Sequence, residues 1–201
     1  MQLKTLPLGA FETNTYLLFF EAEKQLLIID PAAEAELIFE AAKAFPWQTA
    51  RILLTHAHVD HIAGCPETAK RFNVTKVEVA PADVPLYKSP ANAILPYFPA
   101  TANLPETGSF APLPGNGRVL ALPGHTPGGS GFLFDDVLIA GDTIFHTSIG
   151  RTDLPGGDFD TLINSIKNEI FTLPDKTRIY CGHGPATSVG YEKQYNPYLP
   201  K

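Results

Sequence analysis

Apolar runs separated by short polar breaks dominate the N-terminal part of the chain. Thr13–Phe20 and Leu26–Ile29 predict two strands, and the polar residues Glu21–Lys24 between them predict the turn of a hairpin. Ala33–Phe45 places apolar residues at helical spacing among alanines and glutamates. It therefore predicts a helix that ends before Pro46.

The alternation of strand and helix continues after this first unit. Arg51–Leu54 is a short apolar run typical of a buried strand, Pro66–Phe72 predicts a helix, and Lys76–Ala80 predicts the next strand. Strands that alternate with helices in this way are typical of a layered α/β fold.

The C-terminal part predicts three strands, then a helix, then a last strand. In that order they are Arg118–Leu122, Gly131–Phe134, Val137–Ala140, the helix Phe159–Phe171, and Arg178–Cys181. No sequence repeat or linker divides the 201 residues, and a chain of this length can bury one sizeable core. We therefore expect a single domain over residues 1–201.

Residues 81–117 break the regular pattern. Prolines interrupt their apolar residues, which include Tyr87, Ile94 and Tyr97. A loop this long without regular structure is often functional, so we expect a lid or wall beside a binding site. A surface insertion with no role is the alternative.

Charge and cysteine content narrow the class of protein. The net charge is -6 and no run of lysine or arginine occurs, so the sequence does not predict a nucleic-acid partner. Residues 1–7 do not resemble a signal peptide, and no apolar run is long enough to span a membrane. Cys65 and Cys181 are the only cysteines. We expect them to be buried and inert, in a reducing, cytoplasmic setting.

The segment Thr55–His61 concentrates candidate chemistry directly after a predicted strand. His56, His58, Asp60 and His61 fall within six residues. Neutral imidazole and carboxylate are ligands that suit zinc, iron or manganese, so the segment predicts a metal site. A polar loop with solvated histidines is the alternative.

Three further ligand-type residues follow predicted strands and stand beside glycines: His125, Asp142 and His183. Taken singly, each could be an ordinary hydrogen-bonded or turn-forming residue. Binding sites gather at strand ends in layered α/β folds. The prediction of a metal site therefore depends on these three residues lying beside the Thr55–His61 segment in the folded chain. His146 has no such setting, and we expect it to be exposed or to support the ligands.

These motifs, in this order, resemble the metallo-β-lactamase superfamily across most of the chain. The resemblance implies a four-layer αββα sandwich with a site for two metal ions at one edge. It implies that one ion binds His56, His58 and His125. The other would bind Asp60, His61 and His183, with Asp142 bridging the two. Zinc is the expected metal, with iron or manganese as alternatives.

Within that superfamily, the stretches Ile149–Asp158 and Gly182–Thr187, and the C-terminal Glu192–Tyr198, resemble small glyoxalase II-like hydrolases. The resemblance implies hydrolysis of a thioester such as S-lactoylglutathione by a hydroxide between the metals, with Asp60 and Asp142 catalytic. Arg151 is the candidate contact to an anionic substrate, and a salt bridge to Asp153 or Asp158 is its alternative role.

The sequence is also compatible with other activities. Larger glyoxalase II enzymes grip glutathione with a C-terminal helical segment, and Lys201 follows soon after the last ligand motif here, so glutathione recognition is expected to differ. A mononuclear-iron persulfide dioxygenase and a non-catalytic metal-binding protein are the alternatives. A β-lactamase is disfavoured because no secretory signal is visible, and a flavodiiron reductase because that family has glutamate in place of His58. The oligomeric state is not predicted.

Overall fold

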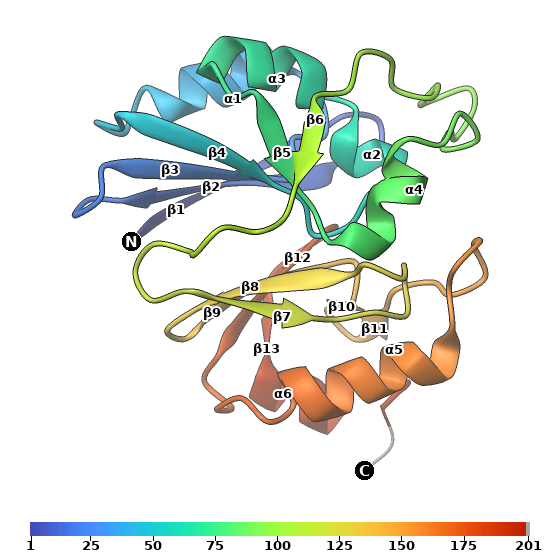
Figure 1. The fold of residues 1–201 in the computed structure, drawn as a ribbon. Helices are drawn as coiled ribbons and strands as arrows, with labels where there is room; N and C mark the ends of the chain where they lie inside the picture. Colours follow the sequence, from blue (N-terminus) through green and yellow to red (C-terminus); the bar gives the residue numbers. More distant parts are fainter. Residues whose placement is uncertain (200–201) are drawn as a thin grey trace.

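The computed structural model describes residues 1–199, which form two β-sheets packed face to face (Figure 1). The first sheet has the order β1-β2-β3-β4-β5-β6. Its strands are Gln2–Leu8, Thr13–Phe20, Gln25–Ile29, Thr49–Leu53, Lys76–Glu78 and Glu106–Gly108. The strands pair antiparallel from β1 to β3 and parallel from β3 to β6.

The second sheet has the order β13-β12-β9-β8-β7. In chain order its strands are β7 (Arg118–Ala121), β8 (Ser130–Phe134), β9 (Val137–Gly141), β12 (Arg178–Cys181) and β13 (Thr187–Ser188). Strands β7, β8 and β9 form an antiparallel meander, and β12 joins β9 in parallel. A separate hairpin of β10 (Ile144–Phe145) and β11 (Ser148–Ile149) follows β9.

Helices cover the outer face of each sheet. Figure 1 shows α1 (Ala35–Ala42) and α3 (Cys65–Phe72) over the first sheet, and α5 (Phe159–Ser165) with α6 (Val189–Tyr195) against the second. A π-helical turn, η2, extends α5 over Ile166–Ile170. The layers therefore run helix, sheet, sheet, helix, which confirms the predicted four-layer αββα sandwich.

The period-two pattern of the strands explains why this layering forms. Successive side chains of a strand point to opposite faces of its sheet, so a wholly apolar strand feeds two cores. In β2, Leu17 and Phe19 pack toward the helices, whereas Tyr16 and Leu18 pack between the sheets. The second sheet repeats this: Leu138 and Ala140 face α5, while Phe132 and Ile139 lie between the sheets.

Several element boundaries differ from the sequence predictions. The helix predicted over Ala33–Phe45 is confined to α1, and the strand predicted over Lys76–Ala80 ends at Glu78. The helix predicted over Phe159–Phe171 changes to π geometry at Ile166. The pattern did not predict β1, β6, β10, β11, β13 or α6. Most of these are short or exposed, and so lack a strong apolar period.

Residues 81–117 are less irregular than expected. They contain a 3-10 turn, η1 (Pro81–Asp83), the helical turn α4 (Val84–Tyr87) and the strand β6. Strand β6 pairs in parallel with β5 and so extends the first sheet. The segment is thus built into the sandwich at both ends.

Candidate metal centre

The seven predicted ligands lie together at one edge of the sandwich, where strands of both sheets end. His56 and His58 follow β4, and Asp60 and His61 lie in the short helix α2 (Val59–Ile62). His125 lies in the loop between β7 and β8, Asp142 follows β9, and His183 follows β12. Backbone hydrogen bonds between the sheets hold this edge closed, from Asn14 to Gly182 and from Ser130 to Thr55.

The first group of ligand atoms belongs to His56, His58 and His125. Nδ1 of His58 lies 2.9 Å from Nε2 of His125, and the rings of His56 and His125 are 4.8 Å apart. Two N–H groups could not point at each other across 2.9 Å, so at least one of these nitrogens has a free lone pair. Three converging imidazole nitrogens form a donor set that suits a divalent transition-metal ion.

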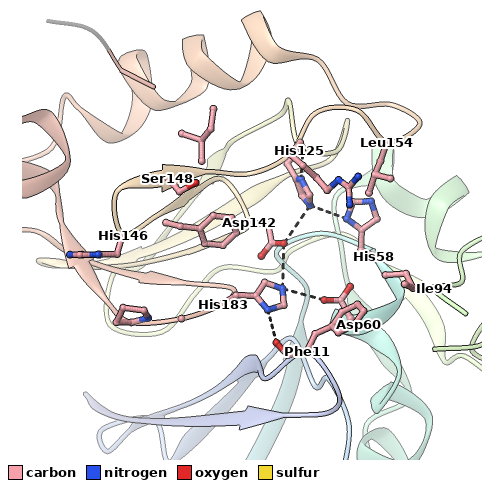
Figure 2. A pocket seen from close by; sticks show the side chains of 15 residues that line it. Phe11, His58, Asp60, Ile94, His125, Asp142, His146, Ser148, Leu154 and His183 are labelled. Atoms are coloured by element: carbon pink, nitrogen blue, oxygen red, sulfur yellow. Dashed lines mark hydrogen bonds and ion pairs between the residues drawn. The ribbon is translucent and has the colours of Figure 1, made fainter. Parts of the chain in front are cut away.

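The second group belongs to Asp60, His61 and His183. Nε2 of His183 lies 3.2 Å from Oδ2 of Asp60, and Nε2 of His61 lies 3.5 Å from the same oxygen. Asp142 lies between the groups (Figure 2): its Oδ2 is 3.6 Å from Nε2 of both His125 and His183. Its carboxylate is therefore within reach of both sets of imidazoles.

Unpartnered buried atoms fit metal ligation. Nε2 of His56, Nε2 of His61 and Oδ1 of Asp142 are buried and accept or donate no hydrogen bond among the described residues. An orphaned buried polar atom costs about 1–3 kcal/mol, and a metal ion at either group would remove that cost. These residues could thus hold two divalent ions.

The histidines of the site are of two kinds, because the pKa is lowered in some of them and raised in others. Burial and the neighbouring His125 lower the pKa of His58 to about 4, and burial and His61 lower the pKa of His56 well below its ordinary value. Burial disfavours a charge on His183 too, but hydrogen bonds to Asp142 and Asp60 outweigh it and raise its pKa to about 9. Metal binding at the second group therefore has to displace a proton.

Hydrogen bonds from outside the ligand set fix the ring orientations. Nδ1 of His61 lies 2.9 Å from Oδ2 of Asp30, which also accepts a hydrogen bond from the Thr55 hydroxyl. Nδ1 of His125 donates to the carbonyl of Arg151, and Nδ1 of His183 to that of Phe11. In each case the partner on Nδ1 leaves Nε2 free to face the site.

Asp83 is a further supporting residue, and no motif in the sequence marks it. Its side chain is fully buried in η1. Oδ2 accepts hydrogen bonds from the Ala57 amide and the Thr126 hydroxyl, both at 2.9 Å, and Oδ1 accepts one from the Gly128 amide at 2.6 Å. Ala57 separates His56 from His58, and Thr126 follows His125. One carboxylate thus ties together the two loops that carry the first ligand group.

Sequence reasoning missed Asp30 for a different reason. It follows β3 just as Asp142 follows β9, so the same signal of a carboxylate after an apolar strand was present. Because Pro31 follows it, Asp30 is equally typical of a residue that simply ends a strand. In the structure Asp30 has a left-handed φ of 51° and accepts hydrogen bonds from the Thr55 amide and hydroxyl.

Members of both ligand groups line a cavity of about 580 Å³, and these are His58, Asp60, His125, Asp142 and His183. Most of its wall is apolar, and the apolar wall residues are Phe11, Ile94, Phe145, Ile149, Leu154 and Pro185. Ile94 belongs to the 81–117 segment, which therefore reaches the cavity. A volume of this size is in the range of small-molecule binding sites.

The remaining candidates lie around this cavity. Arg151 lines it and forms a bidentate ion pair with Asp153, at 2.7 and 2.8 Å, on the exposed surface. His146 lies at the cavity rim, stacked on Tyr191. Cys65 and Cys181 are both buried and free, and burial raises the pKa of the Cys181 thiol to about 12, so it stays protonated. Over residues 1–199, no helix has the length and apolar character needed to cross a membrane.

Comparisons with known proteins agree with this geometry. The family model of the metallo-beta-lactamase superfamily matches residues 8–183. The chain is 36% identical to a hydroxyacylglutathione hydrolase, GloC, of Haemophilus influenzae, an alignment that covers 99% of this chain and 98% of that protein. It is also 36% identical to a probable metallo-hydrolase of Streptococcus pyogenes, over 92% of this chain and 85% of that one.

Solved structures give the same result. A structure described as BLEG-1 B3 metallo-beta-lactamase superimposes with a TM-score of 0.88 at 34% identity, over the full length of both chains. A di-iron-bound form of TTHA1623 superimposes with a TM-score of 0.85 at 32% identity, over 98% of this chain and 100% of that chain. The chain therefore belongs to the metallo-beta-lactamase superfamily.

Proposed function

We propose that this protein is a metal-dependent hydrolase that cleaves a thioester such as S-lactoylglutathione. The observation that carries the proposal is the pair of ligand groups on either side of Asp142, beside an open cavity. The similarity to a hydroxyacylglutathione hydrolase supports this choice of substrate.

Divalent ions in such a site lower the pKa of water and polarise a carbonyl oxygen, which is the chemistry that hydrolysis requires. Zinc is our first choice for both ions, and the likeness to a di-iron protein keeps iron as an alternative, with manganese.

The contacts of the Asp60 carboxylate support a role in proton transfer. Oδ2 accepts a hydrogen bond from the Thr13 hydroxyl at 3.1 Å and lies 3.2 Å from His183. We assign Asp60 to orienting the attacking water and accepting its proton, and Asp142 to holding the two ligand groups at a fixed separation.

The overall reaction adds the oxygen of water to the acyl carbon and breaks the carbon–sulfur bond. The thiol carrier leaves as a thiolate, whose conjugate acid has a pKa of about 8.5 in a simple thiol. A leaving group this acidic needs little help from a general acid. Among residues 1–199, His146 is the one imidazole of the cavity wall outside the ligand set, and a thioester does not require it as an acid.

Arg151 is our candidate for binding an anionic part of the substrate. Its ion pair with Asp153 is exposed, and exposed pairs contribute about 0–1 kcal/mol. A substrate carboxylate could replace Asp153 at small cost. Arg151→Gln should raise KM for S-lactoylglutathione with little change in kcat. Arg118→Gln, an exposed arginine on β7 outside the cavity, is the control.

The decisive experiment is an assay of purified, metal-quantified protein against S-lactoylglutathione. We expect hydrolysis that is lost by at least a hundredfold in Asp142→Ala and retained in Asp136→Asn, an exposed carboxylate of the loop between β8 and β9. Absence of thioesterase activity with both metal sites filled would contradict the proposal. Retained metal and unchanged hydrolysis in Asp60→Ala would contradict the role given to Asp60. If the filled protein hydrolyses no substrate at all, a non-catalytic metal-binding protein becomes the better assignment.

Two other reactions belong in the same assay. Hydrolysis of a β-lactam amide is the second candidate, because the chain resembles a B3 metallo-beta-lactamase along its full length. One iron per chain, with oxygen consumed on glutathione persulfide, would instead identify a persulfide dioxygenase.

A further inference from the structure

The β10–β11 hairpin forms one end of the cavity wall directly after Asp142. Phe145, His146, Ser148 and Ile149 of this hairpin all line the cavity. The ring of Phe145 lies 6.2 Å from the ring of His183, so the hairpin begins beside the second ligand group. In Figure 2, His146 and Ser148 lie on one side of Asp142 and His183, and His58 and Leu154 lie on the other.

The two ends of the cavity differ in charge. The hairpin contributes no carboxylate, ammonium or guanidinium group to the wall. Arg151 is the guanidinium of the wall, and its backbone carbonyl binds His125, which places its main chain at the opposite end from His146. This asymmetry suits a substrate with one charged arm and one uncharged arm.

Aromatic rings continue from the hairpin onto α6. His146 stacks on Tyr191 with ring centroids 4.9 Å apart and planes 20° apart, and Tyr191 contacts Tyr195 at 4.8 Å. Flat, exposed aromatic faces offer apolar contact area at low entropic cost. The rim of this end is thus suited to an apolar or aromatic group.

A buried carboxylate holds the hairpin in place. Glu192 of α6 is fully buried, and both its oxygens accept hydrogen bonds from the Thr147 amide, at 3.2 and 3.1 Å. Thr147 has a left-handed φ of 58°, as the tight turn requires. Asn196 donates to the carbonyl of Ser148 at 2.9 Å and to Glu192 at 2.8 Å. Burying a carboxylate costs free energy unless it is well hydrogen-bonded. Most of the hydrogen bonds that Glu192 accepts come from Thr147 at the turn of the hairpin and from Asn196, which also binds the hairpin at Ser148.

We propose that the β10–β11 hairpin is the acyl subsite of the enzyme, selective for uncharged apolar or aromatic acyl groups, and that Glu192 is its positioning residue. This inference rests on the proposed thioesterase function. The thiol carrier then extends toward Arg151, and the acyl group lies against Phe145 and Ile149.

The test compares two 2-hydroxyacyl thioesters that differ only in the acyl substituent, S-mandeloylglutathione with a phenyl and S-lactoylglutathione with a methyl. Phe145→Ala should lower the mandeloyl-to-lactoyl ratio of kcat/KM by about tenfold or more, because apolar pockets discriminate on this scale. Phe159→Ala, an exposed phenylalanine of α5 outside the cavity, is the matched control and should leave the ratio unchanged.

Binding without turnover gives an independent measurement. S-hexylglutathione and S-methylglutathione are thioethers that cannot be hydrolysed, and their affinity ratio, measured by calorimetry, should fall about tenfold in Phe145→Ala. Glu192→Gln should lower the mandeloyl-to-lactoyl ratio through a higher KM for S-mandeloylglutathione, with metal content unchanged.

The possible outcomes distinguish failure of the proposed acyl subsite from failure of the proposed thioesterase function. A wild-type enzyme that hydrolyses both thioesters, with both ratios unchanged in Phe145→Ala, would overturn the subsite and leave the thioesterase proposal standing. Loss of metal in Glu192→Gln, with an unchanged mandeloyl-to-lactoyl ratio, would overturn its role as a positioning residue of the hairpin. A metal-loaded wild-type protein that hydrolyses neither thioester would overturn the function, and the subsite with it.

Discussion

Two glycines beside His183 have very different environments. A β-carbon at Gly182 would lie 1.9 Å from Oδ1 of Asp142 and 2.9 Å from His61. A β-carbon at Gly184 would meet nothing within 4 Å, although its φ of +70° is left-handed. The first glycine is thus required by close packing against two ligands, and the second only by backbone conformation.

This difference predicts that alanine at Gly182 impairs hydrolysis, whereas alanine at Gly184 lowers only the stability of the fold. Gly182→Ala should displace the Asp142 carboxylate and reduce hydrolysis by about a hundredfold, since misplacement by about 1 Å has this effect. Gly184→Ala should keep its metal and lose about 1–2 kcal/mol of stability from backbone strain alone. Metal content, thioesterase rate and thermal unfolding of both variants check this. Equal loss of metal in the two would contradict it.

The shifted histidines predict a stability maximum for the metal-free protein near pH 6.5. The pKa of His183 is raised to about 9, so its stabilising contribution is complete below pH 6.5 and is lost as the pH rises through 9. The pKa of His58 is lowered to about 4, so its contribution is complete above pH 6.5 and is lost as the pH falls toward 4. Urea unfolding of chelator-treated protein from pH 4 to 10 measures this. His183→Asn should flatten the alkaline side, and an unchanged slope there would be inconsistent with the shift.

At the scale of elements, the metal ligands lie in loops at strand ends, and η1, a turn distant in sequence, holds two of these loops in position. Asp83 connects the loop of His56 and His58 to the loop of His125, although it belongs to neither. Asn92 adds a hydrogen bond to the Ala57 carbonyl at 2.8 Å. The start of the 81–117 segment therefore supports the first ligand group from behind.

Asp83→Asn is expected to weaken metal binding at the first group by about 10–100-fold, the usual effect of losing a partner that orients ligands. An amide can accept at only one of the two oxygen positions, so either the Gly128 amide or the Ala57 amide loses its acceptor. Metal titration followed by mass spectrometry measures the change. Glu192→Gln, which alters an equally buried carboxylate away from the ligands, should retain both ions. Full metal occupancy in Asp83→Asn would refute this role.

Prediction of elements from the sequence succeeded where the apolar pattern was strong. The central strands β2, β3, β4, β8, β9 and β12 all lie where the pattern placed them, because their side chains are buried in the cores of the sandwich. Strand β1 is mostly exposed, and β10, β11 and β13 have two residues each. Such strands are stabilised by pairing with neighbours rather than by their own composition, so the sequence alone does not mark them.

At the scale of the whole molecule, the metal centre lies across the junction of the two sheets. Ligands from α2 and the end of β4 come from the first sheet, and Asp142 and His183 come from the second. Metal binding should therefore stabilise the contact between the two halves of the sandwich as well as the local loops.

Removal of metal should lower the stability of the entire fold. At a hundredfold excess of free zinc over its Kd, binding stabilises a protein by about 2.7 kcal/mol per site. For a chain of this size that is a rise in Tm of about 5–10 °C. Calorimetry of chelated and zinc-reloaded protein measures it. An identical Tm in both states would show that the seven residues hold no structurally coupled metal.

The sequence by itself determined where the central strands lie and which seven ligand-type residues follow strands, and its resemblance to a known superfamily implied the αββα layering. The strands and the positions of the ligands follow from apolar periodicity and from residue type, which are local properties of the chain. The tertiary structure decided which ligands face each other, and it brought Asp30, Asp83 and Glu192 to their partners. Those three contacts span 25 to 45 residues of sequence. Pairing of β3 with β4 brings Asp30 to Thr55, and the packing of η1 and α6 brings Asp83 and Glu192 to their partners. These contacts form only in the folded chain, so the partners cannot be predicted from a pattern within one segment.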